Sequence, residues 1–275
     1  MSPPISALVE EHAHPGSVTG GGKSRLRLLT YNIQTAVAST RPHHYFTRSW
    51  KHVLPHFSSF DNLDRIARLA SQYDVVALQE ADAGSLRSYF INQVEYLARR
   101  GHFPFWCHQT NRDLGKFAQH SNGLLSRIRP SMIEQHKLPG LIPGRGAMAV
   151  RFGHHDNPIM LILVHLALGR RTRQRQLDFL GELVCDYEHA VVMGDFNCAP
   201  QSREMDRLLT VSKLCEPTQI LHTFPSWRPI RNIDHILTTP SLKVTNLQVL
   251  NHAISDHLPI AVEIEVPETV QLLAN

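Results

Sequence analysis

The hydrophobic residues of this chain gather into short runs separated by polar turns, without an internal repeat. Apolar residues spaced three or four positions apart predict helices at 62–73, 85–100, 173–187 and 202–210. The second of these helices is predicted because four apolar residues would share one of its faces: Leu86, Phe90, Val94 and Leu97. Continuous apolar runs of strand length occur at 26–32, 75–80, 122–127, 147–152, 159–165, 191–195, 233–238, 244–250 and 259–266. This mixture predicts one α/β domain with two β-rich layers flanked by helices.

The two ends of the chain fall outside this pattern. Residues 1–24 combine prolines, histidines and acidic residues with a glycine run and contain no continuous apolar stretch, so we expect a flexible N-terminal tail. No linker rich in proline, glycine or serine interrupts the chain after residue 24. The domain is therefore expected to span 25–268, with a C-terminal tail at 269–275.

Composition narrows the class of protein. The 275 residues are 42% hydrophobic and 19% charged, which is typical of a globular chain and excludes a fibrous or disordered one. No apolar run reaches the roughly 18 residues that cross a bilayer, and no secretory signal pattern is present. The four cysteines form no C-x-x-C pair. We expect a cytoplasmic protein with free thiols, and we favour a monomer. The net charge of +4 is mildly basic.

Polar residues repeatedly follow the predicted strands. Asn32 ends the first strand and Glu80 the second, while His165 and Asp195 end two later ones. Each alone has an ordinary explanation, since Asp and Asn also cap helices and form turns. Side chains at strand ends lie at the rim of a sheet, where loops build functional sites. Their recurrence predicts one polar site at such a rim.

The sequences around these strand ends carry a family resemblance. The motifs TYNIQ (30–34), LQEAD (78–82), VHLAL (164–168), GDFN (194–197), IDHIL (233–237) and SDHLPI (255–260) occur in that order. Together they resemble the endonuclease/exonuclease/phosphatase superfamily of metal-dependent phosphoesterases, and the uncharacterised bacterial proteins within it most of all. The resemblance implies an α/β fold, a four-layer α/β/β/α sandwich with two mixed β-sheets packed face to face and flanking helices. It also implies a site at one edge of the sheets and Mg²⁺ or Mn²⁺ as the metal.

Residue chemistry agrees with such a metal. Mg²⁺ prefers oxygen ligands and keeps part of its coordination for water and substrate phosphate. Glu80 with Asn32 beside it fits that open set, and no His/Cys group suggests zinc. The resemblance adds Asp256 as a ligand on the opposite side of the metal.

The resemblance also assigns the groups that act on the phosphate. It implies that Asp195 orients or deprotonates the attacking water and that Asn197 donates a hydrogen bond to that water or to a phosphoryl oxygen. His257 would contact the phosphate as an imidazolium held by Asp234, a carboxylate that should raise its pKa. His165 would lie on the other side of the phosphate as electrostatic support or proton donor.

Three further residues are candidates for binding substrate. Asn122, in the motif SNGLLSR, matches an amide that touches substrate in the superfamily. Arg170 and Arg171 open the helix predicted near 173–187, a placement that the helix dipole disfavours. If Thr172 is the N-cap, Arg175 occupies the position where a capping box has Glu or Gln. Arginines at a helix start close to His165 go against these capping and dipole preferences, which suggests that they bind an anion there. A solvent-exposed arginine face would give the same sequence pattern.

Residues 41–57 mix basic and aromatic side chains. This composition suits single-stranded nucleic acid, an interfacial lipid contact or ordinary packing. By contrast, His235 should point to the opposite sheet face from Asp234 and be structural. Cys198 is expected to be only a small neighbour of Asn197.

The sequence thus predicts a Mg²⁺- or Mn²⁺-dependent hydrolase of phosphodiesters, and we favour a nuclease acting on DNA or RNA. The superfamily's abasic-site endonucleases usually begin the first motif with Trp-Asn and carry an aromatic residue after the late Asp. Here Tyr31 precedes Asn32 and His235 follows Asp234, which argues against that repair activity. A phosphatase or phosphodiesterase for phospholipid head groups, inositol phosphates or other small esters is the alternative. A catalytically silent binding module on the same fold is the second alternative.

Overall fold

The computed structural model describes residues 24–36, 58–113, 119–140 and 144–273. Residues 1–23, nearly all of the expected N-terminal tail, lie outside the described residues, as does the basic and aromatic stretch at 41–57. Within the described part of the chain, no helix is long and apolar enough to cross a membrane.

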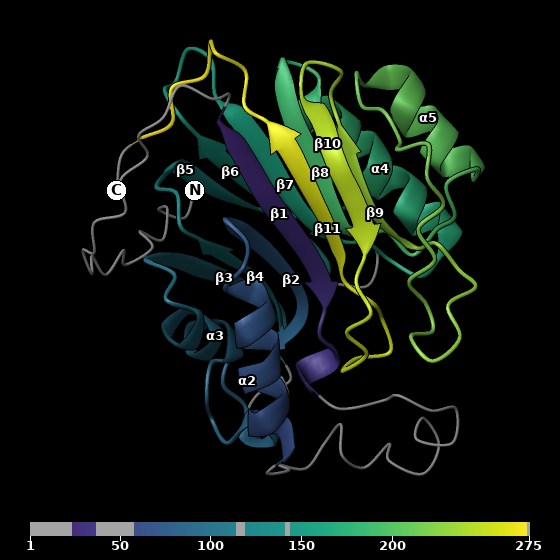
Figure 1. Ribbon diagram of the computed structural model, residues 1–275. Coiled ribbons are helices and arrows are strands. Elements are labelled where there is room, and N and C mark those ends of the chain that lie inside the picture. The colour runs from purple at the N-terminus through teal and green to yellow at the C-terminus, as the bar shows by residue number, and fades with distance from the viewer. Residues whose placement is uncertain (1–23, 37–57, 114–118, 141–143, 274–275) are drawn as a thin grey trace, which may run out of the picture.

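In the described part of the chain, eleven strands form two mixed sheets, which Figure 1 shows packed against each other. In the first sheet the spatial order is β10-β11-β1-β2-β4-β3, and in the second it is β5-β6-β7-β8-β9. The first sheet contains β1 (Arg25–Asn32), β2 (Val75–Asp82), β3 (Phe105–Asp113), β4 (Gln119–Ser126), β10 (Lys243–Val249) and β11 (Ile260–Glu265). The second contains β5 (Pro130–Lys137), β6 (Gly146–Phe152), β7 (Ile159–His165), β8 (His189–Asp195) and β9 (Asp234–Thr238). The pairs β1/β2 and β7/β8 are parallel, and all other pairs are antiparallel.

Helices cover the outer face of each sheet. Figure 1 shows α2 (Ser58–Ala70) and α3 (Gln93–Gly101) on the first sheet, and α4 (Arg170–Val184) and α5 (Arg203–Val211) on the second. Two short 3₁₀ turns, η1 (Gln34–Ala36) and η3 (Leu86–Ser88), follow β1 and β2. One apolar cluster lies between the sheets, and two more join each sheet to its helices. The expected α/β/β/α sandwich is confirmed.

The strands are apolar throughout because both of their faces are buried. In β1, Leu28 packs between the sheets, whereas Leu29 packs under α2 and α3. In β8, Val191 and Met193 face the first sheet, and Val192 faces α4 and α5. This period of two is the strand geometry, and double burial explains the lack of polar alternation in the sequence. All nine predicted strands are present, with bounds that shift by a few residues.

Two strands and part of one helix differ from the prediction. β3 and β5 were not expected, and each lies at the edge of its sheet, where one side of the strand stays polar. The helix predicted at 85–100 is wrong in its first half, where only η3 forms and Phe90 is 60% exposed. The carboxylate of Asp82 accepts hydrogen bonds from the backbone of Ser85 and the hydroxyl of Ser88, which fixes a turn instead. Asn92 then caps α3.

Candidate active site

The polar strand ends meet at one edge of the sandwich, the lower edge in Figure 1. In the second sheet His165, Asp195 and Asp234 are direct neighbours, because β7 ends, β8 ends and β9 begins in the same register. Asn32 and Glu80 reach the same place from the first sheet. The topology alone therefore assembles residues that are far apart in the sequence.

The carboxylate of Asp195 is the centre of this group. Its Oδ2 atom lies 3.2 Å from Nδ2 of Asn32, 3.4 Å from Nε2 of His165 and 3.9 Å from Nε2 of His257. Asp195 is buried, and burial raises its pKa to about 7, helped by the negative charges of Asp234 and Glu80 and opposed by His257. A side chain with this pKa can accept a proton from a water near neutral pH.

Asp234 holds His257 in one orientation. Nδ1 of His257 lies 2.8 Å from Oδ2 of Asp234, and Thr223 donates its hydroxyl to the same oxygen. Burial disfavours the imidazolium, but Asp234, Asp195 and Asp256 outweigh it and raise the pKa of His257 to about 10. His257 is thus a buried cation that presents Nε2 toward Asp195, and the expected rise in its pKa is confirmed.

Asn32, Glu80 and Asp256 lie on the first-sheet side of the same site. The Nδ2 atom of Asn32 is 3.3 Å from Oε1 of Glu80. Gln34 joins Asn32 to Asp256, since its backbone N–H donates to Oδ1 of Asn32 at 3.1 Å and its side-chain amide donates to Oδ2 of Asp256 at 3.1 Å. Burial raises the pKa of Asp256 to about 6, and Glu80 adds to this rise.

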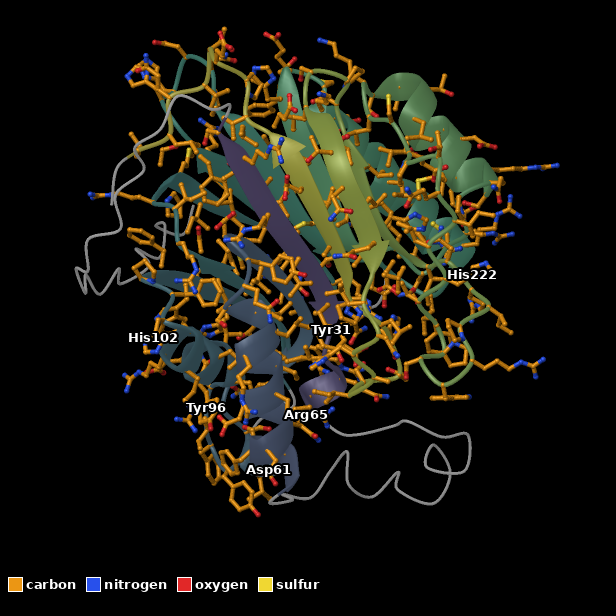
Figure 2. The ribbon with its side chains drawn as sticks, in the orientation of Figure 1. Tyr31, Asp61, Arg65, Tyr96, His102 and His222 are labelled. Carbon is orange, nitrogen blue, oxygen red and sulfur yellow. The ribbon has the colours of Figure 1, made fainter. Side chains whose placement is uncertain are left out.

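Tyr31 anchors the loop that carries Asp256 and His257. Its hydroxyl donates to the carbonyl of His252 at 2.9 Å and accepts the backbone N–H of Ser255 at 3.2 Å. Figure 2 shows Tyr31 at the end of β1, and Tyr31 directly precedes Asn32. The residue that departs from the Trp-Asn pattern is therefore buried and ties β1 to this loop.

Unusual backbone geometry aims several of these side chains. Glu80 has a positive φ of 56° at an irregularity in the pairing of β2 with β4, and Asn197 has a φ of 54°. Non-glycine residues adopt this region rarely, and such residues cluster at functional sites. Gly194 has a φ of 144°, and a Cβ there would lie 2.0 Å from the carbonyl O of Val164. Only glycine fits immediately before Asp195.

The donor set fits a hard divalent cation. Glu80, Asp195 and Asp256 supply carboxylate oxygens, and the negative charge of Glu80 adds to the raised pKa values of both Asp195 and Asp256. Asp195, Asp234 and His257 also place one ligand atom each within 4.8 Å of the others. Magnesium and manganese favour oxygen-rich sites of this kind, and a bound cation would relieve the carboxylate repulsion.

Arg145 also lies in this site, although no sequence pattern predicted it. Its Nη1 atom lies 2.8 Å from Nδ1 and 2.9 Å from Nε2 of His165. The pKa of His165 falls well below its usual value because of burial first, and then because of the charges of Arg145, His257 and His120. His165 is therefore neutral. The available signal was position: Arg145 lies two residues before the strand predicted at 147–152, which starts at the edge where the strand at 159–165 ends.

Asn122 and Asn197 make structural contacts inside this region. Nδ2 of Asn122 donates to the carbonyl of Gly146 at 3.1 Å, and its Oδ1 atom is buried without a partner among the described residues. The backbone N–H of Asn197 donates to Oδ1 of Asp195 at 2.9 Å, and its Nδ2 donates to the carbonyl of Leu166 at 2.9 Å. Asn122 thus holds the residue after Arg145, and Asn197 orients Asp195.

The arginines at the start of α4 differ from one another. The helix begins at Arg170 with Gly169 as its N-cap, so Thr172 lies inside the helix and the condition for a capping box with Arg175 is not met. Arg173 is buried and binds Glu204, and Nε of Arg170 lies 3.3 Å from Oε2 of the same carboxylate. Arg171 is exposed. Of the two arginines predicted to bind substrate, Arg171 has no such carboxylate partner among the described residues.

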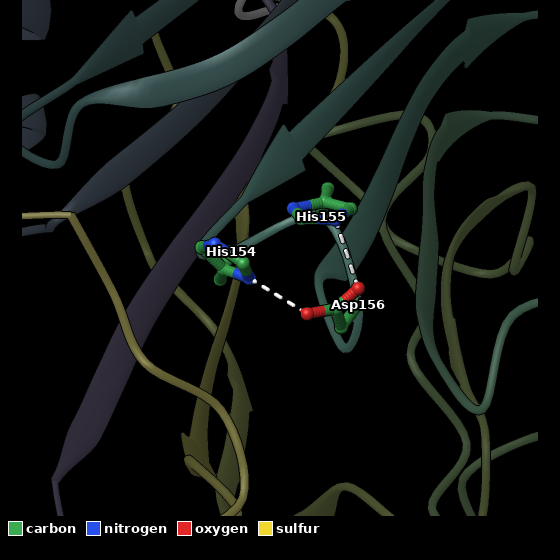
Figure 3. Close-up of side chains that lie close together, drawn as sticks. All are labelled: His154, His155 and Asp156. Atoms are coloured by element: carbon green, nitrogen blue, oxygen red, sulfur yellow. Dashed lines mark ion pairs between the residues drawn. The ribbon is translucent and has the colours of Figure 1, made fainter.

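Two other polar groups lie apart from the site. Nε2 of His235 is 2.8 Å from the carbonyl O of Cys198, which gives it a structural contact on the helix side of β9. His154, His155 and Asp156 form an exposed group on the turn between β6 and β7, at the opposite edge of the sandwich (Figure 3). Asp156 pairs with both histidines, at 3.1 Å and 2.9 Å.

Comparison with known proteins agrees with this architecture. The family model described as "Endonuclease/Exonuclease/phosphatase family" matches residues 29–257. A protein of that family from Beutenbergia cavernae has a similar structure, with a TM-score of 0.68, 21% identity, and coverage of 88% of this chain and 72% of that one. The structure of the catalytic domain of human Nocturnin with bound sulfate is also similar, with a TM-score of 0.63 and 18% identity. The match covers 87% of this chain and 93% of that one. A mannosyl-6-phosphatase from Bacteroides thetaiotaomicron has a similar structure too, with a TM-score of 0.63 and 17% identity. The match covers 87% of this chain and 99% of that one. No curated protein sequence is significantly similar.

Proposed function

The chain belongs to the endonuclease/exonuclease/phosphatase family, and we propose that it is a Mg²⁺- or Mn²⁺-dependent hydrolase of phosphodiesters. The observation that carries this proposal is the environment of Asp195. One buried carboxylate oxygen faces an amide, a neutral histidine and a histidine cation, all within 3.9 Å. Such a carboxylate can accept a proton while the surrounding donors bind an anion.

In this proposal Asp195 orients a water and takes its proton as the water oxygen bonds to phosphorus. Its pKa of about 7 suits that role near neutral pH. Asn197 keeps the carboxylate in place through its backbone N–H. As the new P–O bond forms, the bond to the leaving oxygen breaks, and that oxygen takes up a proton from solvent or a neighbouring group.

Charge on the phosphoryl oxygens is met by fixed donors. His257, held as a cation by Asp234, and Arg145 both carry positive charge into the buried site. His165 is neutral and supports the site through hydrogen bonding rather than charge. Preorganised donors of this kind stabilise the transition state without reorganising during the reaction.

Asn32, Glu80 and Asp256 would hold the metal. A divalent cation there polarises the phosphate, lowers the pKa of bound water and offsets the negative charge of the reacting oxygens. Glu80 lies on the β2 irregularity with a positive φ, a costly conformation that supports a functional role for this residue.

For the substrate we favour a nucleic acid, DNA or RNA. Arg171 is exposed in the first turn of α4, which follows β7 and His165 in the chain, and it supports a contact to a phosphate backbone because arginine binds phosphate in a bidentate manner. A small phosphate ester is the second candidate, supported by the mannosyl-6-phosphatase among the fold neighbours. Every acidic and histidine position of the proposed site holds a residue that can perform its role in catalysis. This argues against a binding module without catalytic activity.

A metal-dependence screen over four substrate classes tests this function. Purified protein, stripped with chelator, is supplied with Mg²⁺, Mn²⁺ or Ca²⁺ and offered DNA, RNA, sugar phosphates and phospholipid head groups. We expect cleavage of DNA or RNA with Mg²⁺ or Mn²⁺, and less with Ca²⁺. Cleavage confined to a small ester would reverse the substrate choice, and no turnover in any arm would reject the proposed function.

A further inference from the structure

The edge that carries the site continues beyond Arg145 onto the first sheet. Because β4 runs antiparallel to β2 and β3 antiparallel to β4, the start of β4 and the end of β3 lie at the same edge as Glu80. Arg112, near the end of β3, is the register partner of His120, near the start of β4. On β2, Asp82 lies two residues after Glu80 and pairs with His120. Arg112 and His120 are therefore neighbours on adjacent strands at the edge that carries the site.

Arg112 and Arg145 are neighbours across the two sheets. A Cβ on Gly144 would lie 3.2 Å from Cβ of Arg112, so Arg112 covers the residue directly before Arg145. Electrostatics agrees with this proximity. The pKa of Arg145 is lowered by burial first, while Glu80 and Asp195 oppose the change and Arg112 adds to it. His120 likewise contributes to the lowered pKa of His165.

The acidic groups nearby are already engaged. Asp82, on the adjacent strand, is fully buried and accepts hydrogen bonds from the backbone of Gly84 and from Ser85 and Ser88. Glu80 and Asp195 face Arg145 within the catalytic group. Arg112 is exposed and forms no ion pair with the described residues. An exposed arginine held near a second arginine and a histidine, and not paired with a carboxylate among the described residues, has the charge and the donors to bind an anion.

We propose that Arg112, His120 and Arg145 form a second phosphate subsite, which binds a phosphate of the substrate other than the one that is cleaved. This inference rests on the proposed function, since it assumes that the phosphate next to Asp195 is the reacting one. The shared chemistry is a substrate with two phosphate groups. A nucleic-acid strand and a bisphosphorylated inositol both provide it.

Direct binding measurements test the subsite and separate these two sources. Calorimetry in Ca²⁺ compares thymidine 5′-monophosphate with thymidine 3′,5′-bisphosphate, and inositol monophosphate with inositol bisphosphate. One extra charge-assisted contact should tighten binding of the bisphosphate about tenfold in at least one pair. A gain in the thymidine pair identifies a nucleic-acid strand, and a gain in the inositol pair identifies the small ester.

The variant Arg112→Ala should reduce the ratio of the two dissociation constants to near one, and Arg112→Lys should retain part of it. Arg129→Ala is the matched control, because Arg129 is an exposed arginine on the turn between β4 and β5, at the opposite edge. Equal binding of mono- and bisphosphate by the wild-type protein overturns the subsite, as does a ratio that survives Arg112→Ala. Turnover of bis(p-nitrophenyl) phosphate, which has a single phosphate, tests the proposed function separately.

Discussion

The ring of His257 lies between two carboxylates, with Nδ1 at 2.8 Å from Oδ2 of Asp234 and Nε2 at 3.9 Å from Oδ2 of Asp195. The closer carboxylate fixes the ring orientation, and Thr223 in turn holds that carboxylate through its hydroxyl. The arrangement leaves His257 charged in a buried place, which is costly unless both partners remain. Its protonation should therefore control both activity and stability.

Replacing Asp234 by Asn should move the falling limb of the pH–rate profile to lower pH. Pairing raises the pKa of His257 from 6.5 to about 10, so its contribution to folding is complete below pH 6.5 and is lost as the pH rises through about 10. The melting-temperature difference between wild type and Asp234→Asn should accordingly shrink as the pH approaches 10. Asp156→Asn removes an exposed carboxylate that also pairs with histidine, and should change neither measurement. An unmoved limb would refute the pair.

Replacing Glu80 by Gln should raise the Mg²⁺ or Mn²⁺ concentration for half-maximal activity by at least about tenfold. The reason is the loss of a carboxylate ligand beside Asn32. A readout without turnover is the melting temperature, which metal should raise in the wild type and raise less in the variant. Glu182→Gln on the exposed side of α4 is the control. Equal metal dependence in Glu80→Gln and wild type would remove Glu80 from the metal site.

Replacing Arg145 by Ala should lower kcat/KM by about 10- to 100-fold, because a charge-assisted donor to the phosphate is lost. Arg145→Lys should recover part of the activity, since it restores the charge without the planar group. Arg129→Ala tests whether removal of any arginine has this effect. If Arg145→Ala keeps full kcat/KM at an unchanged melting temperature, the arginine only packs against His165.

Salt dependence distinguishes a polymeric from a small substrate. On DNA or RNA, Arg171→Ala should flatten the log–log slope of affinity against salt by about 0.7 to 0.9, the value for one phosphate contact. Arg170→Ala should change the slope less, because Arg170 pairs with Glu204. With a small substrate the wild-type slope is shallow, and both variants raise KM for every substrate alike. That second pattern would contradict nuclease activity.

Much of the fold was predictable because the sandwich buries most strands on both faces, which leaves clear apolar runs. The edge strands β3 and β5 were missed because one side of each is polar. The helix expected from residue 85 failed through a single carboxylate, Asp82, whose hydrogen bonds favour a turn over the helical spacing of Leu86 and Phe90. Hydrogen bonds from a side chain to the nearby backbone can replace those of a helix, and the spacing of apolar residues does not reveal them.

The sequence predicted those residues of the candidate site that lie at the end of a strand or directly after one. Asn32, Asp195 and His165 were found in this way, and the topology places their side chains in contact. Arg145 escaped because it precedes a strand and carries no motif of its own. Its role depends on the pairing of β6 with β7, a long-range property that no local pattern contains.

The central claim is that metal-dependent hydrolysis depends on the carboxylate of Asp195. The most direct measurement is the turnover of bis(p-nitrophenyl) phosphate by chelator-treated wild type and Asp195→Asn, each with and without Mn²⁺. We predict turnover only for wild type with metal, and a loss of at least about 100-fold in the variant. Because burial raises the pKa of Asp195 to about 7, its ionised form destabilises the fold above that pH, so Asp195→Asn should melt at the same or a higher temperature at pH 8. Full turnover without metal, or by Asp195→Asn, would contradict the account.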